Sequence, residues 1–149
     1  MAVHATAIIE DGARLGADVE IGPFCIVGRN AVLGDGVRLL SHVAIAGHTD
    51  IGARTVVHPQ AVLGGLSQIR ENDFEGRLTV GADCVIREGV TMSCGSRKGG
   101  GVTTVGNNGY FMAQSHIGHD CHVGDDVTFA NAATLSGHVE IGQGVIFGG

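Results

Sequence analysis

The sequence predicts an all-β solenoid, a parallel β-helix of about seven triangular coils, and two observations support this prediction. Apolar residues recur at every sixth position in long runs, and the residue after them is Gly in twelve of twenty-two cases. A period of six fits neither an α-helix at 3.6 nor an amphipathic strand at 2, but it fits short strands joined by tight turns. Glycine at the turn allows a sharp change of chain direction.

The apolar position of the repeat can be followed through most of the chain. It runs unbroken from Val3 to Leu63, resumes from Val80 to Met92, and resumes again from Val105 to Phe147. Four residues after each apolar position the residue is mostly small or β-branched, and we expect both positions to point inward and form a thin core. Three hexads close one coil, so residues eighteen apart lie above one another at about 4.8 Å.

Two segments interrupt the repeat, at residues 65–79 and 93–104. The first is polar and charged, and it is either a plain surface loop or a loop that binds substrate. The second contains Gly99, Gly100 and Gly101, which form either a flexible tip or a cradle for phosphate. No stretch shows a helical period.

Composition excludes several classes of function. The formal net charge is −6 and no run of Lys or Arg is present, so we expect no nucleic-acid partner. No apolar stretch approaches the roughly 20 residues of a membrane span and no signal peptide precedes the repeat, which favours a cytoplasmic protein. We expect one domain, 1–149. Because the chain ends inside a hexad without a polar cap, we expect it to be the front part of a longer protein.

The four cysteines predict neither disulfides nor a cysteine-rich zinc site. Cys25, Cys84 and Cys121 fall at the second inward position of their hexads, where they serve as small core residues. Cys94 falls in the second interruption and is expected to be exposed. No CxxC pair is present.

The histidines behave differently, because none of the eight occupies an inward position. Those at positions 4, 42, 48 and 58 are expected to be solvated or in turns. His116, His119, His122 and His138 gather within two neighbouring coils. His116 and His122 are one hexad apart and should lie on different faces. A three-histidine zinc site is therefore the less favoured interpretation, and we expect no metal and no cofactor.

The eighteen-residue register places His119 over Gly137 and Asp120 over His138. An imidazole whose tautomer is fixed by a carboxylate can take a proton from an alcohol. His119 with Asp120 therefore has the parts of a general base. Gly137 adds a backbone N–H that could stabilise an oxyanion.

Seven stretches, spread over nearly the whole chain, match one known family. The most specific are His-Ile-Gly-His-Asp-Cys at 116–121 and Leu-Ser-Gly-His at 135–138. The others are 4–8, 21–25, 41–43, 86–88 and 99–101, and the last match extends back to 131. The chain resembles the bacterial UDP-N-acetylglucosamine 3-O-acyltransferases, left-handed β-helix enzymes that open lipid A synthesis. The resemblance implies a left-handed coil and a homotrimer with active sites between subunits. It also implies further coils and a C-terminal helical domain in the whole protein.

The resemblance further implies a reaction and roles for residues. An (R)-3-hydroxyacyl group would pass from acyl carrier protein to the 3-hydroxyl of UDP-N-acetylglucosamine without an acyl-enzyme. His119 would be the general base, Asp120 its orienting partner and the Gly137 amide the oxyanion donor. The expected substrate contacts are Gln68, His116 and His138.

The chain also departs from the family pattern in both interruptions. The run 68–71 is Gln-Ile-Arg-Glu where the family has Asp after the glutamine and a Lys nearby, and Ser-Cys-Gly at 93–95 replaces His-Arg-Gly. The changes at Ile69 and Ser93 therefore leave the exact acceptor sugar open. The resemblance leaves acyl chain length open as well, because the family sets it in coils beyond Gly149. The alternatives are another sugar-nucleotide acyl- or acetyltransferase of the same solenoid class, and a metal-binding or structural β-helix.

Overall fold

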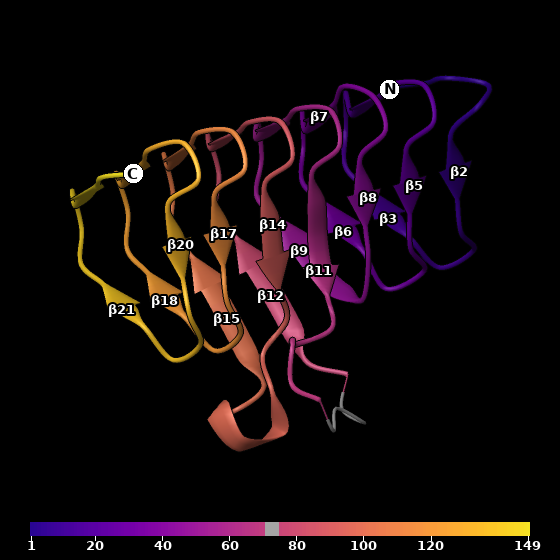
Figure 1. The fold of residues 1–149 in the computed structure, drawn as a ribbon. Helices are drawn as coiled ribbons and strands as arrows, with labels where there is room; N and C mark the ends of the chain where they lie inside the picture. Colours follow the sequence, from indigo (N-terminus) through magenta and orange to yellow (C-terminus); the bar gives the residue numbers. More distant parts are fainter. Residues whose placement is uncertain (71–74) are drawn as a thin grey trace.

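The computed structural model describes residues 1–70 and 75–149 and shows a left-handed parallel β-helix (Figure 1). Short strands form three parallel sheets, each of which receives one strand from every coil. Sheet A contains β1 (Ala2–Val3), β4 (Glu20–Ile21), β7 (Arg38–Leu39), β10 (Val56–Val57), β13 (Val85–Ile86), β16 (Tyr110–Phe111), β19 (Thr128–Phe129) and β22 (Ile146–Phe147). Sheet B contains β2 (Ile8–Ile9), β5 (Ile26–Val27), β8 (Ala44–Ile45), β11 (Val62–Gly65), β14 (Thr91–Ser93), β17 (His116–Ile117) and β20 (Thr134–Leu135). Sheet C contains β3 (Arg14–Leu15), β6 (Val32–Leu33), β9 (His48–Ile51), β12 (Arg77–Val80), β15 (Val102–Val105), β18 (His122–Val123) and β21 (Glu140–Ile141).

The hexad predicts the strands correctly. Every strand of the described residues contains one of the twenty-two apolar repeat positions, and away from the interruptions paired residues are eighteen apart, as in Ile117 with Leu135. Successive side chains on a strand point to opposite faces, so the apolar residue points into the prism and the residue before it points outward. Seven coils are complete, and β22 begins an eighth.

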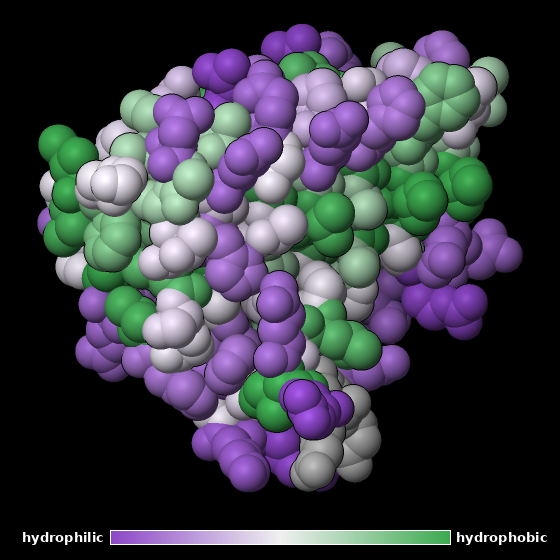
Figure 2. Space-filling view, viewed as in Figure 1, coloured by the Kyte–Doolittle hydropathy of each residue, from purple (hydrophilic) through white to green (hydrophobic). Residues whose placement is uncertain are grey.

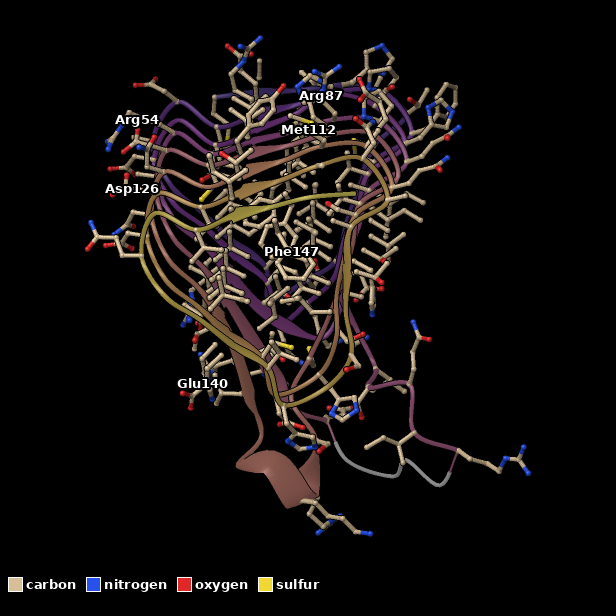
Figure 3. The ribbon with its side chains drawn as sticks, turned by 60° about the vertical axis from the view of Figure 1, so that its left-hand side comes forward. Arg54, Arg87, Met112, Asp126, Glu140 and Phe147 are labelled. Carbon is tan, nitrogen blue, oxygen red and sulfur yellow. The ribbon has the colours of Figure 1, made fainter. Side chains whose placement is uncertain are left out.

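The core is narrow and made of stacked layers. Cys25, Cys84 and Cys121 are each fully buried at the second inward position, as predicted. Towards the C-terminal end the layers become aromatic, and the rings of Phe111, Phe129 and Phe147 follow one another at centroid distances of 5.2 and 5.4 Å. Figure 3 shows the triangular section with Phe147 inside it.

The corners of the prism hold residues in left-handed backbone conformation. Asp83, Asp120, Asp126 and His138 have φ of 57°, 59°, 57° and 64°. Asp and His tolerate this region better than most side chains. The turn therefore fixes where these polar side chains project, at the edges between sheets.

Both interruptions are shorter than the sequence predicts. Gly65 ends β11, β12 begins at Arg77, Ser93 ends β14 and β15 begins at Val102, so the loops cover residues 66–76 and 94–101. The reason is pairing, since β12 extends to four residues alongside β9 and β15. The second loop also contains one short 3₁₀ turn, Arg97–Gly99, in a chain expected to have no helix.

Cys94 contradicts the prediction that it is exposed, because only 2% of its surface is accessible. Its amide donates to the Gly65 carbonyl at 2.8 Å and its thiol to the Gly64 carbonyl at 3.3 Å. The chain thus continues the coil past β14 before the loop leaves it. Burial raises the pKa of this thiol to about 11. Within the described residues, no helix is long and apolar enough to cross a membrane.

Candidate active site

One corner of the prism, the edge between sheets B and C, holds the residues singled out by the sequence. His119 and Asp120 connect β17 to β18, and Gly137 and His138 connect β20 to β21. On the two preceding coils the same corner extrudes both loops, which project together from one edge in Figure 1. The predicted cluster and the two interruptions of the repeat therefore share a single edge, here named the B–C corner.

His119 and Asp120 form a hydrogen-bonded dyad. His119 Nδ1 lies 2.7 Å from Asp120 Oδ2, and the two side chains are 17% and 1% exposed. An ionised carboxylate can only accept, so the imidazole carries its proton on Nδ1 and leaves the Nε2 lone pair free. This is the tautomer that a general base requires.

The Asp120 carboxylate is held by more than the histidine. Ser96 donates its amide to Oδ1 at 2.8 Å and its hydroxyl to Oδ2 at 2.5 Å. Burial acts to raise the pKa of Asp120, but the hydrogen bonds from Ser96 and His119 outweigh it and hold the pKa below its usual value. The Asp120 amide itself donates to Thr103 Oγ1 at 2.8 Å. The carboxylate is therefore ionised at neutral pH in a fixed orientation.

Gly137 packs directly against the His119 ring. A Cβ at residue 137 would lie 2.4 to 2.9 Å from three ring atoms, so only glycine fits against the imidazole. The His138 amide donates to the His119 carbonyl at 3.0 Å, which confirms the predicted contact between the two corners. Among residues 1–70 and 75–149 the Gly137 N–H has no acceptor.

The two other predicted histidines flank the dyad. His138 Nε2 lies 3.9 Å from Asp120 Oδ2, and its ring meets that of His119 edge-on at a centroid distance of 4.9 Å. His116 shares a hydrogen bond of 2.7 Å with Thr91 Oγ1. Burial lowers the pKa of His116, an interaction with the Thr91 backbone partly offsets this, and proximity to His119 lowers the pKa further. His116 is therefore neutral at pH 7.

Gln68 is not placed with the dyad by any contact. Its side chain is exposed in the first loop and makes no hydrogen bond within the part of the chain that the structure describes. Glu71, the last residue of the run 68–71, lies outside the described residues.

The structure brings together a different set of possible metal ligands from the one that the sequence suggested, but it gives the metal site little support. His116 and His122 lie on different sheets, on β17 and β18, as predicted. The donor atoms that do converge, within 4.8 Å of one another, belong to His119, Asp120 and His138. Both carboxylate oxygens already accept hydrogen bonds at 2.5 to 2.8 Å, so a cation would have to displace them.

Sequence reasoning missed the second loop's contribution. Ser96, Gly99 and Thr103 all contact Asp120, and a Cβ at residue 99 would lie 2.1 Å from its carboxyl carbon. Gly99 is therefore explained by an internal contact, and a phosphate there would face an ionised carboxylate, which argues against a phosphate cradle. Ser96 and Asp120 are 24 residues apart. No eighteen-residue register connects them, so the pair could not be predicted from the repeat.

Comparison with known proteins places this chain and its fold in one family. Residues 6–41 match the bacterial transferase hexapeptide (six repeats) family. The acyl-[acyl-carrier-protein]–UDP-N-acetylglucosamine O-acyltransferase of Rhizobium johnstonii is 50% identical over 148 residues, which cover 99% of this chain and 54% of the relative. The chain belongs to the UDP-N-acetylglucosamine O-acyltransferase family.

Other members of this family agree in sequence and in structure. The Sinorhizobium fredii O-acyltransferase is 47% identical, over 99% of this chain and 55% of its own length. The solved structure of the UDP-N-acetylglucosamine O-acyltransferase from Moraxella catarrhalis superimposes with a TM-score of 0.94 at 38% identity, over 98% of this chain and 57% of that one. The structure from Francisella novicida gives 0.95 at 34% identity, over 98% and 54%. The chain spans about half the length of the curated relatives it matches.

Proposed function

We propose that the protein containing this chain is an acyltransferase that moves an (R)-3-hydroxyacyl group from acyl carrier protein to the 3-hydroxyl of UDP-N-acetylglucosamine, the first step of lipid A synthesis. Family membership over 99% of the chain supports the reaction. The observation that supports it most directly is the dyad, a histidine 2.7 Å from a buried carboxylate. Beside it lies the Gly137 N–H, which has no acceptor among the described residues.

The proposed reaction is a direct attack by the sugar. His119 Nε2 takes the proton of the 3-hydroxyl as its oxygen attacks the thioester carbonyl carbon. Negative charge then develops on the carbonyl oxygen, where the Gly137 N–H donates. When the C–S bond breaks, the imidazolium returns its proton to the thiolate. Asp120 fixes the ring and stabilises the imidazolium while it lasts.

A covalent acyl-enzyme is not needed for this route, and the cysteines do not favour one. Cys121 is adjacent to the dyad, but it is fully buried and burial raises the pKa of its thiol. A thiol in that setting is a poor nucleophile. We assign His116, His138 and Gln68 to contacts with the substrates rather than to the chemical step.

We further propose a homotrimer with active sites between subunits, located in the cytoplasm. The outer face of sheet B is apolar towards the N-terminal end, where Ile8, Ile26 and Val62 are 57%, 46% and 38% exposed (Figure 2). Exposed apolar rows of this kind are typical of surfaces that pack against another subunit. The four cysteines are free thiols, which suits a reducing compartment.

The test is acyl transfer by the intact protein carrying His119→Ala, with His122→Ala as the matched control. His122 is one strand away on sheet C, is exposed, and contacts Thr104 rather than Asp120. We expect His119→Ala to lower kcat/KM by about 10² to 10⁴-fold and the control to stay within about twofold. A His119→Ala variant within about threefold of wild type would remove this residue from the mechanism.

A second arm of the same assay tests the substrate assignment. Acetyl-CoA is offered in place of hydroxyacyl carrier protein, and other nucleotide sugars replace UDP-N-acetylglucosamine. Preference for acetyl-CoA would identify a different acyl- or acetyltransferase of the same solenoid class. Absence of transfer from every donor, together with stoichiometric zinc lost in His138→Ala, would favour a metal-binding protein.

A further inference from the structure

We propose that Ser96, in the second loop, is a positioning residue for the His119–Asp120 dyad, and that the loop at residues 94–101 acts as a clamp on the Asp120 carboxylate. The inference rests on the proposed function for its consequence in catalysis. Its structural basis is independent of that function. Ser96 gives both of its donors, the amide and the hydroxyl, to the two oxygens of one carboxylate.

The clamp encloses Asp120 completely. Ser96 is 2% exposed and the Asp120 side chain 1% exposed. On the other side the Gly99 backbone lies so close to the carboxylate that no side chain fits there. Thr103, the second residue of β15, accepts the Asp120 amide. The carboxylate thus has one orientation available, and that orientation directs Oδ2 at His119 Nδ1.

The loop is itself anchored to the coils, so it can transmit a fixed geometry. The Gly95 amide donates to the Arg77 carbonyl at 3.1 Å, and the Gly99 amide to the Ser96 carbonyl at 3.2 Å. Cys94, at the loop's start, is tied to Gly64 and Gly65 of the coil below. At the far end of the loop the Gly101 carbonyl accepts a hydrogen bond from the Arg77 amide at 2.8 Å. Because hydrogen bonds hold both ends of the loop, Ser96 keeps a fixed position relative to Asp120.

The hydroxyl matters because Oδ2 receives two hydrogen bonds, from Ser96 and from His119. If the Ser96 hydroxyl is removed, the carboxylate keeps the Ser96 amide on Oδ1 but loses the donor that holds Oδ2 beside His119. The imidazole then loses part of its preference for the tautomer with the proton on Nδ1. The carboxylate also has one donor fewer, so its negative charge acts more strongly on the imidazolium.

The experiment compares Ser96→Ala, Ser96→Thr and the control Thr104→Val in the intact protein. Thr104 lies on β15, and its hydroxyl contacts His122. Thr104→Val therefore deletes a contact between a hydroxyl and a histidine outside the dyad. We expect Ser96→Ala to lower kcat about 10- to 100-fold with KM nearly unchanged. The acidic limb of its pH profile should move to higher pH. Ser96→Thr should recover activity to within about threefold, and Thr104→Val should match wild type.

An NMR measurement that does not depend on enzymatic activity tests this proposal separately from the proposed function. In protein labelled with ¹⁵N-histidine, the His119 signals, assigned by their loss in His119→Ala, report which ring nitrogen carries the proton. We expect the Nδ1–H tautomer in wild type and Ser96→Thr, and a mixture in Ser96→Ala. An unchanged tautomer and pH limb in a folded Ser96→Ala variant would overturn the clamp. A wild-type protein that transfers no acyl group would overturn the proposed function and leave the tautomer result standing.

Discussion

Asp120 and Asp126 occupy the same position in consecutive hexads, with nearly the same backbone, φ 59° and 57°. Asp126 lies at the corner between sheets C and A, where it accepts hydrogen bonds from Asn108 and Gln143 and stays exposed (Figure 3). Asp120 lies at the B–C corner and its side chain is 1% exposed. The repeat supplies an aspartate in the same conformation at both corners. The loop at residues 94–101, which covers only one of them, makes the difference.

The other side chains of the C–A corner show what the repeat does without a loop. Asp35 accepts the Ala17 amide at 2.8 Å, Asn107 accepts the Ala82 amide at 2.8 Å, and Asp125 accepts the Asn107 amide at 2.6 Å. Each links one coil to the next and each is exposed to water. These polar side chains stabilise turns. Burial by a loop converts the same type of residue into an orienting partner for a histidine.

The strongest test of this difference is Asp120→Asn against Asp126→Asn. An amide at residue 120 can donate to His119 Nδ1 and so favours the wrong tautomer, and we expect kcat to fall by about 10³-fold or more. Asp126→Asn should stay within about twofold. Acyl transfer by the intact protein measures both. Equal losses in the two variants would show that the loop confers no special role on Asp120.

Gly137→Ala should have the next largest effect. The backbone of residue 137 is not in a left-handed conformation, but the new methyl group would overlap the His119 ring, so the imidazole must move. We expect kcat to fall by about 10²-fold with the fold retained, because misplacing a catalytic group by about 1 Å costs that much. The control is Gly65→Ala, since a Cβ at residue 65 would meet nothing within 4 Å among the described residues. Circular dichroism checks the fold, and unaltered activity of Gly137→Ala would show that the ring is not held there.

The pH dependence of stability should report on the Asp120 carboxylate. Because the pKa of Asp120 is lowered on folding, its ionised form stabilises the protein above its unfolded pKa of about 3.9, and this contribution is lost as pH falls through the folded pKa. The difference in melting temperature between wild type and Asp120→Asn should therefore shrink below about pH 4. Calorimetry between pH 3 and 7 measures it. A difference that stays constant over this range would mean that folding does not change the pKa of Asp120.

The smallest expected effect compares two buried serines. Ser96 makes two hydrogen bonds to Asp120, whereas the Ser115 hydroxyl is buried without a partner within the described residues. A hydroxyl buried without a hydrogen bond carries a desolvation cost, and Ser115→Ala removes it. The free energy of unfolding should therefore rise by about 1 kcal/mol. Ser96→Ala should lower it. Urea titration gives both values, and a destabilised Ser115→Ala would point to a hydrogen bond to buried water.

The sequence by itself determined the strands, the core and one contact of the site. Apolar residues at a period of six fix which side chains point inward, and eighteen residues per coil place His119 against Gly137. Such predictions succeed because each coil repeats the geometry of the previous one, so a distance in sequence converts directly into a distance in space. The left-handed coil could not be predicted from the repeat, because general crossover preferences favour the right hand. That prediction came only from the resemblance to the family.

Only the tertiary structure decided what happens where the repeat is broken. The pairing of β12 with β9 and β15 set the loop boundaries, and continuation of the coil past β14 buried Cys94. The return path of the second loop brought Ser96 to Asp120 across 24 residues. A loop has no register, so its path depends on which coil atoms can satisfy its hydrogen bonds, and these are known only once the coils are stacked.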